Sequence, residues 1–316
     1  MINQNSPEYE KETVILAQID LTTGSIPKTL LRFAFPMICG NLLQQLYNVA
    51  DTLIVGRFLG SDALGAVGSS YTLMTFLTSI LLGLCMGSGA LFSVCWGQRD
   101  LARLRRQTHA AFVLIAVCTV VLNAAAFLLL DAMKTLLSVP AEVWPLMRSY
   151  LFVIFFGIGG TFLYNYYASL LRAVGNSLVP LLFLAAAAVL NIALDLVFVL
   201  VCRWGVEGAA AATVLAQWLS GIGTAVYTLV HCPELRARRE ERRITGSMLR
   251  ELLSASVLTC LQQSVMNLGI LMVQGRINSF GPVIMAAFAA AVKIDSFAYM
   301  PLQDFGNAFS TFIAQN

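Results

Sequence analysis

Two acidic side chains interrupt stretches that otherwise resemble membrane-spanning helices. Asp51 lies within "LLQQLYNVADTLIVGRFLG" (42–60), and Asn191 and Asp195 interrupt "LNIALDLVFVLV" (190–201). A carboxylate near the centre of a bilayer costs roughly 3 kcal/mol on insertion scales. Gln44, Asn48 and Asp51 follow an i, i+4, i+7 spacing, which places them on one stripe of a helix. Buried acids in two separate spans indicate a proton or cation site.

A third polar stripe is expected on the span near residues 206–230. Thr213, Gln217, Ser220 and Thr224 recur there at helical spacing. Unsatisfied polar groups in hydrocarbon cost several kcal/mol each, so these stripes should converge away from lipid. Two neighbouring carboxylates cannot both stay ionised cheaply, and we expect one to hold a proton near neutral pH.

The same oxygens suit a hard cation. Na⁺ prefers oxygen ligands, which Asp51, Asn191, Asp195 and Thr213 would supply. The alternative is a structural hydrogen-bond network between helices.

Further polar and aromatic side chains are candidates for lining a cavity. Lys293 and Asp304 lie eleven residues apart on one face of the last predicted span. Lys293 is expected to pair with an acid across the cavity or to extend toward the interface. Tyr164 and Tyr167 can attract an organic cation through their ring faces, or can serve aromatic helix packing instead. The glycines of "GLCMGSG" (83–89) favour close helix packing.

The composition is that of an all-α polytopic membrane protein. Of 316 residues, 58% are hydrophobic and 12% are charged, whereas a soluble domain carries about 25% charge. The net charge of +3 is too small to indicate nucleic-acid binding, and the seven cysteines show no metal-site spacing. Neither a nucleophile–base pair nor a metal cluster points to an enzyme. Eight spans are expected, near 28–57, 65–96, 108–130, 146–171, 178–201, 206–230, 250–275 and 283–313.

Basic residues are distributed unevenly between alternate loops. Most Lys and Arg residues fall before the first span and after every second span, which predicts a cytoplasmic N-terminus. The expected domains are a cytoplasmic segment at 1–27, a six-helix bundle at 28–230, a basic cytoplasmic linker at 231–249, and the start of a second bundle at 250–316. The linker is a solvated connection or, alternatively, a contact for lipid headgroups.

An internal repeat relates the beginning of the chain to its end. "LLQQLYNVADTLIVGR" (42–57) matches "LQQSVMNLGILMVQGR" (261–276), and "LFSVCWGQ" (91–98) matches "AFSTFIAQ" (308–315). The first two spans are therefore echoed by the last two. A repeat that begins after six spans predicts a transporter of twelve spans, of which this sequence would hold eight.

These stretches together resemble the MATE (multidrug and toxic compound extrusion) transporters, in their bacterial DinF-like branch. The resemblance rests on the order and spacing of "YNVADTLIVGRFLGSDALGAVG", "GQRD", "LRAVGNSLVP", "NIALDLVFV" and "FSTFIAQN". It implies two six-helix lobes in a V around a central cavity, acting as a monomer in the bacterial plasma (inner) membrane. It also implies that an H⁺ or Na⁺ gradient drives efflux of organic cations, with no other cofactor.

The resemblance assigns roles to particular residues. It implies a cation-coupling site at Asp51, Asn191, Asp195 and Thr213, and a helix bend at Pro36. The remaining cavity candidates are Gln44, Asn48, Tyr164, Tyr167, Gln217, Lys293 and Asp304. The repeat carries Gly269 and Ile270 where an acid would correspond to Asp51, so a second ion site in that helix is not expected.

Two other functions fit part of the pattern. One is a flippase for lipid-linked saccharides in the same superfamily, whose cavity should carry several basic residues for phosphates. Apart from Lys293, the spans offer few such residues. The other is a non-functional fragment, because one complete lobe and two further helices do not enclose a whole cavity.

Overall fold

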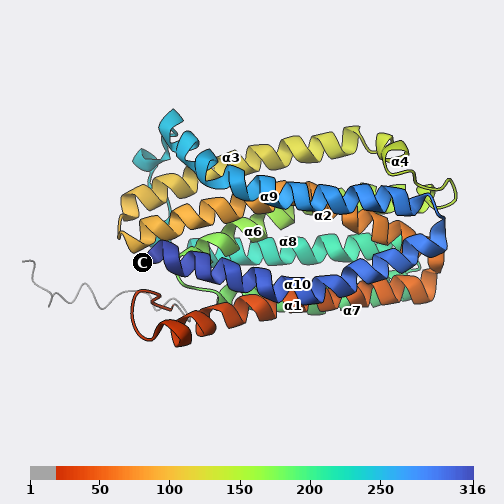
Figure 1. Ribbon diagram of the computed structural model, residues 1–316, viewed down its shortest axis with the longest axis horizontal. Coiled ribbons are helices and arrows are strands. Elements are labelled where there is room, and N and C mark those ends of the chain that lie inside the picture. The colour runs from red at the N-terminus through yellow and green to blue at the C-terminus, as the bar shows by residue number, and fades with distance from the viewer. Residues whose placement is uncertain (1–18) are drawn as a thin grey trace, which may run out of the picture.

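The computed structural model describes residues 19–316, and within them all regular structure is helical. Long helices run side by side along the longest axis of the molecule (Figure 1). Residues 1–18, which form most of the predicted cytoplasmic segment at 1–27, lie outside the described residues.

The helices follow the order expected from the apolar runs. Their bounds are α1 (Ile26–Leu59), α2 (Ser61–Gly97), α3 (Leu101–Leu128), α4 (Ala132–Leu136), α5 (Trp144–Ile154), η2 (Phe155–Gly157), α6 (Ile158–Ala173), α7 (Leu178–Asp195), η3 (Leu196–Val201), α8 (Gly205–His231), η4 (Pro233–Leu235), η5 (Arg239–Arg242), α9 (Gly246–Asn278) and α10 (Pro282–Gln315).

Seven helical stretches in the described residues are long and apolar enough to cross a membrane. One of them joins α5, η2 and α6 into a single span at Trp144–Ala173, and another joins α7 and η3 at Leu178–Val201. The eighth expected span corresponds to the 34-residue α1, which is long enough but is not among the seven. The Asn, Gln and Asp side chains of α1 lower its mean hydropathy. Several of them line the cavity described below and do not face lipid.

Two interruptions distinguish the spans that carry site residues. Pro36 lies inside α1, which continues through it as a helix, so the predicted hinge stays a prediction. Directly after Asp195, the segment Leu196–Val201 is π-helical, and Cys202 N donates to the Val197 carbonyl at 2.9 Å. Such π segments are rare and often occur at functional sites.

The helix pair α1–α2 and the helix pair α9–α10, whose sequences resemble each other, are joined by similar turns. Gly60 joins α1 to α2 with φ 94°, and Gly281 joins α9 to α10 with φ 96°. Both backbones occupy a region that glycine adopts readily and that other residues avoid. The two helix pairs thus turn in the same way, although the division of the chain into lobes at 231–249 stays a prediction.

Helices α9 and α10 pack directly on the first two helices. A Cβ atom on Gly83 would lie 2.4 Å from Cys260 Cα, and one on Gly87 would lie 2.4 Å from Ser256 Cα. Gly68 approaches Ala289 of α10 in the same way. The glycines of 83–89 therefore serve close helix packing, as predicted.

The outer faces of the long helices are apolar, and several charged side chains lie in an otherwise largely apolar interior. Large apolar side chains such as Leu128 (84% exposed) and Leu258 (77%) cover the outer faces of the helices. Asp51, Asp195 and Lys293 are buried instead. This inverted distribution suits a protein surrounded by hydrocarbon and directs the polar stripes toward one interior region.

A side chain at Gly87 should separate α2 from α9. We expect Gly87→Val to destabilise the protein by about 1–3 kcal/mol or more, because backbone atoms fill the space that the side chain needs. Thermal unfolding in detergent measures the effect. Gly269→Val is the matched control, since a Cβ atom there meets nothing within 4 Å. Equal melting temperatures for the two variants would contradict this packing.

Candidate functional site

A cavity of about 260 Å³ lies among α1, α2, α5, α6, α8 and α10, and α7 adds the apolar side chains of Leu184 and Ala187 to its wall. Its walls carry amide, hydroxyl and charged groups from the helices other than α7. Asp51, Arg172, Lys293 and Asp304 are the charged residues that line it. The polar stripes predicted on α1 and α8 both face this space, through Gln44 and Asn48 on α1 and Thr213 and Gln217 on α8.

The two acids of the predicted coupling site lie near each other. Asp195 is close enough to Asp51 and to Lys293 for their charges to interact. Asp51 lines the cavity, whereas Asn191 and Asp195 are fully buried behind it. Asn191 Nδ2 donates to Thr213 Oγ1 at 3.3 Å, which connects α7 to α8. The structure therefore brings the four predicted residues into one region.

Several oxygens in this region have no hydrogen-bond partner. They are Asp51 Oδ1, Asn191 Oδ1 and both carboxylate oxygens of Asp195. Buried polar atoms are normally satisfied, so unpaired acceptors of this kind fit a bound proton or cation. The described residues contain no group of three or more His, Cys, Asp or Glu side chains that could hold a metal. A sodium ion here would depend on amide and hydroxyl oxygens as well as carboxylates.

Lys293 brings a positive charge from α10 to this site. Its ammonium donates to the Asn48 carbonyl at 2.8 Å and to Thr52 Oγ1, both on α1. It also lies 5.0 Å from the centre of the Tyr71 ring. Lys293 is 3% exposed and lies within electrostatic reach of Asp51 and Asp195, but in the described residues it forms no ion pair within 4 Å, so the pairing expected from the sequence is not formed as a direct contact.

A second charged cluster lies elsewhere in the cavity. Asn41 Nδ2 donates to Asp304 Oδ1 at 2.5 Å, while Asp304 Oδ2 has no partner. Arg172, at the last turn of α6, is close enough to interact with Asp304 electrostatically. The Arg172 Nε group is buried without a partner. This cluster thus offers one unused acceptor and one unused donor.

A model of the MatE family matches residues 36–197, which include Asp51, Asn191 and Asp195. The chain belongs to the MATE family of transporters. "Probable multidrug resistance protein YpnP" of Bacillus subtilis is 32% identical over 94% of the chain. "Probable multidrug resistance protein NorM" of Thermotoga maritima is 25% identical over 92%, and the "FAD transporter" of Shewanella oneidensis is 23% identical over 94%.

Solved structures share the MATE fold. A chain described as "Crystal structure of MATE in complex with MaD5" matches 94% of this chain, with a TM-score of 0.82 and 23% identity. A MOP superfamily transporter from Pyrococcus furiosus, whose description refers to a binding pocket of reverse polarity, matches 93% with a TM-score of 0.82. This chain spans 66%, 63% and 66% of the three curated relatives.

Most of the predicted cavity residues line the MATE cavity. Gln44, Asn48, Tyr164, Gln217, Lys293 and Asp304 all do so. The expectation for Tyr167 was wrong. Its ring packs against Tyr166 at 5.0 Å and Phe112 at 6.3 Å between centroids. It therefore belongs to the aromatic packing between α3 and α6, which was the alternative interpretation.

Several residues that line the cavity are not among the candidates from the sequence, including Asn41, Tyr71, Arg172 and Tyr150. Arg172 falls just after the span expected at 146–171, but the structure places it against the cavity. Tyr150 on α5 lines the cavity and lies near both Asp51 and Asp195. In the sequence Tyr150 directly follows Arg148 and Ser149 near the beginning of an apolar run, which gives no indication that it lines a cavity.

Removing Lys293 should destabilise the MATE bundle through the acids that remain. We expect Lys293→Met to cost about 3 kcal/mol, because it leaves buried carboxylates without a counter-charge. The double variant with Asp51→Asn should recover part of this loss. A thermodynamic double-mutant cycle on unfolding in detergent measures the coupling. Simple additivity of the two changes would mean that these side chains do not interact.

Proposed function

We propose that this protein is a secondary efflux transporter that exchanges H⁺ or Na⁺ for organic cations. The observation that carries the proposal is the set of unpaired, buried oxygens on Asp51, Asn191 and Asp195 beside a cavity. These acceptors can bind a small cation from inside the bundle. The names of curated relatives as multidrug resistance proteins support the same function.

The coupling ion would act on the charge balance around Lys293. The ammonium of Lys293 is a positive charge that acts on both carboxylates. A proton or sodium ion that binds to Asp51 or Asp195 neutralises part of their charge and weakens the attraction of Lys293. Since Lys293 comes from α10 and the acids from α1 and α7, this change would alter how α10 is held against the bundle.

The membrane potential can contribute energy to transport, depending on how many charges are exchanged. A charge that crosses 100 mV releases about 2.3 kcal/mol, which corresponds to roughly a fortyfold concentration gradient. A monovalent cation that leaves cancels this electrical contribution. One-for-one exchange would therefore depend on the chemical gradient of the ion, and two ions per substrate would restore an electrical contribution.

The cavity offers an organic cation both aromatic and acidic groups. Tyr71, Tyr150 and Tyr164 line it, and Asp51 and Asp304 add negative charge. Ring faces and carboxylates both attract cations. Pockets for drug-sized ligands usually measure about 300–1,000 Å³. The cavity of about 260 Å³ would have to widen to admit such a substrate.

Export of an anion is the second candidate function. The flippase alternative requires basic groups in the cavity, and Arg172 adds a second one beside Lys293. The unpaired Nε of Arg172 is a free donor for a phosphate or carboxylate. One relative bears the name "FAD transporter", and FAD is an anionic molecule. The cavity thus favours cations at Asp51 and has a basic group for anions at Arg172.

The proposal also includes the orientation of the chain in the membrane and the identity of that membrane. The uneven distribution of basic residues favours a cytoplasmic N-terminus and a cytoplasmic 231–249 linker. The bacterial relatives favour the plasma (inner) membrane of a bacterium.

Replacing the coupling acids should abolish uphill efflux in the full-length protein. Asp51→Asn and Asp195→Asn keep the size of the side chain but remove its charge, so each should reduce uphill transport at least tenfold. Efflux of a fluorescent cation from energised vesicles measures this. A protonophore or the removal of sodium identifies the ion, and a fluorescent anion tests the second candidate.

Asp131→Asn is the matched control. Asp131 lies between α3 and α4, where a hydrogen bond from Arg148 Nε (2.8 Å) lowers its pKa below the ordinary value. It is therefore an ionised acid outside the cavity, and its loss should leave transport unchanged. Uphill transport by the Asp51→Asn, Asp195→Asn double variant would show that the acids are structural. Transport by the full-length protein but not by the 316-residue chain alone would favour the interpretation of this chain as a non-functional fragment.

A further inference from the structure

The segment that follows α8 forms a cleft with the beginning of α3. This cleft measures about 590 Å³ and is lined largely by arginines: Arg105, Arg236, Arg238, Arg239 and Arg242. Its remaining lining residues are Pro233, Glu234 and Ala237. Four of the five arginines come from the segment itself, and Arg105 comes from α3. We call this feature the arginine cleft.

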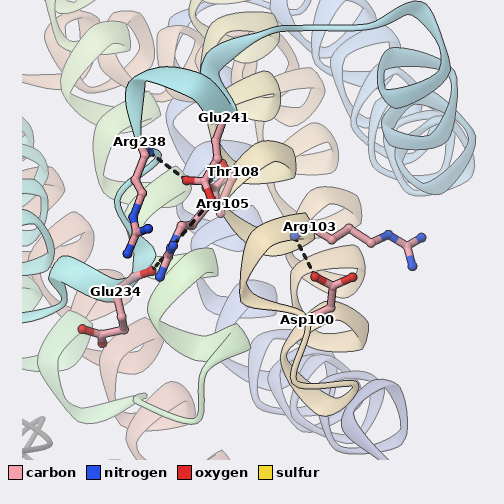
Figure 2. A network of polar contacts seen from close by, with 7 residues as sticks. All are labelled: Asp100, Arg103, Arg105, Thr108, Glu234, Arg238 and Glu241. Atoms are coloured by element: carbon pink, nitrogen blue, oxygen red, sulfur yellow. Dashed lines mark hydrogen bonds and ion pairs between the residues drawn. The ribbon is translucent and has the colours of Figure 1, made fainter.

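The arginine cleft is held in shape by a specific network, which Figure 2 shows from close by. Arg105 Nε donates to the Glu234 carbonyl at 2.6 Å, and Arg105 Nη1 contacts Glu241 Oε1 at 3.5 Å. The other oxygen of Glu241 accepts from the backbone N–H of Arg238 at 2.8 Å. Leu235 is buried beneath the segment. The segment is thus attached to α3 and not merely a solvated connection.

The network uses Glu241 and leaves four guanidinium groups available. In the described residues, the side chains of Arg236, Arg238, Arg239 and Arg242 form no ion pair and no hydrogen bond. All four residues are exposed. Glu234 and the exposed Glu240 are the nearby acids that Arg105 does not pair with, so positive charge exceeds negative charge around the cleft.

Phosphate is the chemical group that such a cleft fits. A guanidinium presents its N–H groups in a planar fork that matches the oxygens of phosphate, and each contact is a charge-assisted hydrogen bond. Several forks around one space can bind a single phosphate together. An anion would also relieve the repulsion between the clustered arginines.

The position of the cleft favours a lipid as the source of that phosphate. It lies between the end of α8 at His231 and the beginning of α3 at Leu101, which are the ends of two membrane-length helices. Phospholipid headgroups lie at this level of a membrane. The last turn of α8 also exposes Leu229 (46%) and Val230 (65%), an apolar surface against which an acyl chain can lie.

We propose that the arginine cleft is a binding site for the phosphate headgroup of an anionic lipid. The site is separate from the central cavity and does not depend on what the cavity transports. It would attach the segment between α8 and α9 to the membrane surface. Basic pockets at the membrane surface that bind anionic headgroups are a known form of lipid recognition.

The test compares two triple variants with the same change of charge. The first, Arg236→Gln with Arg239→Gln and Arg242→Gln, removes basic groups from the cleft. The matched control, Arg57→Gln with Arg203→Gln and Arg276→Gln, removes three exposed arginines outside it. Phosphatidylglycerol is titrated into each full-length protein in detergent, and native mass spectrometry counts the bound lipids. Phosphatidylcholine and inorganic phosphate are the comparison ligands.

We expect the cleft variant to bind phosphatidylglycerol about a hundredfold more weakly and the control to bind it as the unsubstituted protein does. Phosphatidylcholine should bind weakly to all three. Equal weakening in both variants would overturn the proposal, because it would reflect overall charge. Inorganic phosphate that binds the cleft as tightly as the lipid would also overturn it, in favour of a soluble anion.

Discussion

Lys293 places an ammonium group within electrostatic reach of the carboxylates of Asp51 and Asp195, in the interior of a bundle whose outer surface is apolar. None of these charges could remain there alone without a cost of several kcal/mol. The lysine belongs to α10, whereas the acids belong to α1 and α7. Their mutual attraction therefore holds a helix of the second repeat against helices of the first. The glycines of α2, which admit α9 and α10 at close range, make this arrangement sterically feasible.

The cavity therefore has two charged regions, and each of them contains both positive and negative side chains. Lys293 and Asp304 lie eleven residues apart on α10, which is about 16 Å along a helix. Each has partners on α1: Asn48 and Thr52 for the lysine, Asn41 for the acid. A bound molecule would meet positive and negative groups at separate places. Its orientation, and not only its net charge, would then determine how well it is held.

The sequence predicted the spans and much of the site, because helical periodicity and the cost of burying charge are local rules. Asp51, Asn191 and Thr213 could be assigned to inward faces in this way. Tyr167 could not be separated from Tyr164, since both fit an inward stripe and only packing decides between them. Arg172 stands at the end of a span, where its long side chain can reach water or the cavity. Tyr150 follows Arg148 and Ser149 at the beginning of its span, and nothing in that stretch indicates its proximity to both acids, which depends on tertiary contacts.

The π-helical segment Leu196–Val201 closes its hydrogen bonds over five residues, so it accommodates one residue more than an α-helical turn does. In evolutionary terms, such a turn is a single-residue insertion that a helix absorbs while both of its ends stay in place. A relative with an uninterrupted α-helix here would have one residue fewer between its counterparts of Asp195 and Trp204. An alignment of the two would then contain a gap directly after the acid, and that gap would record helix geometry and not evolutionary distance.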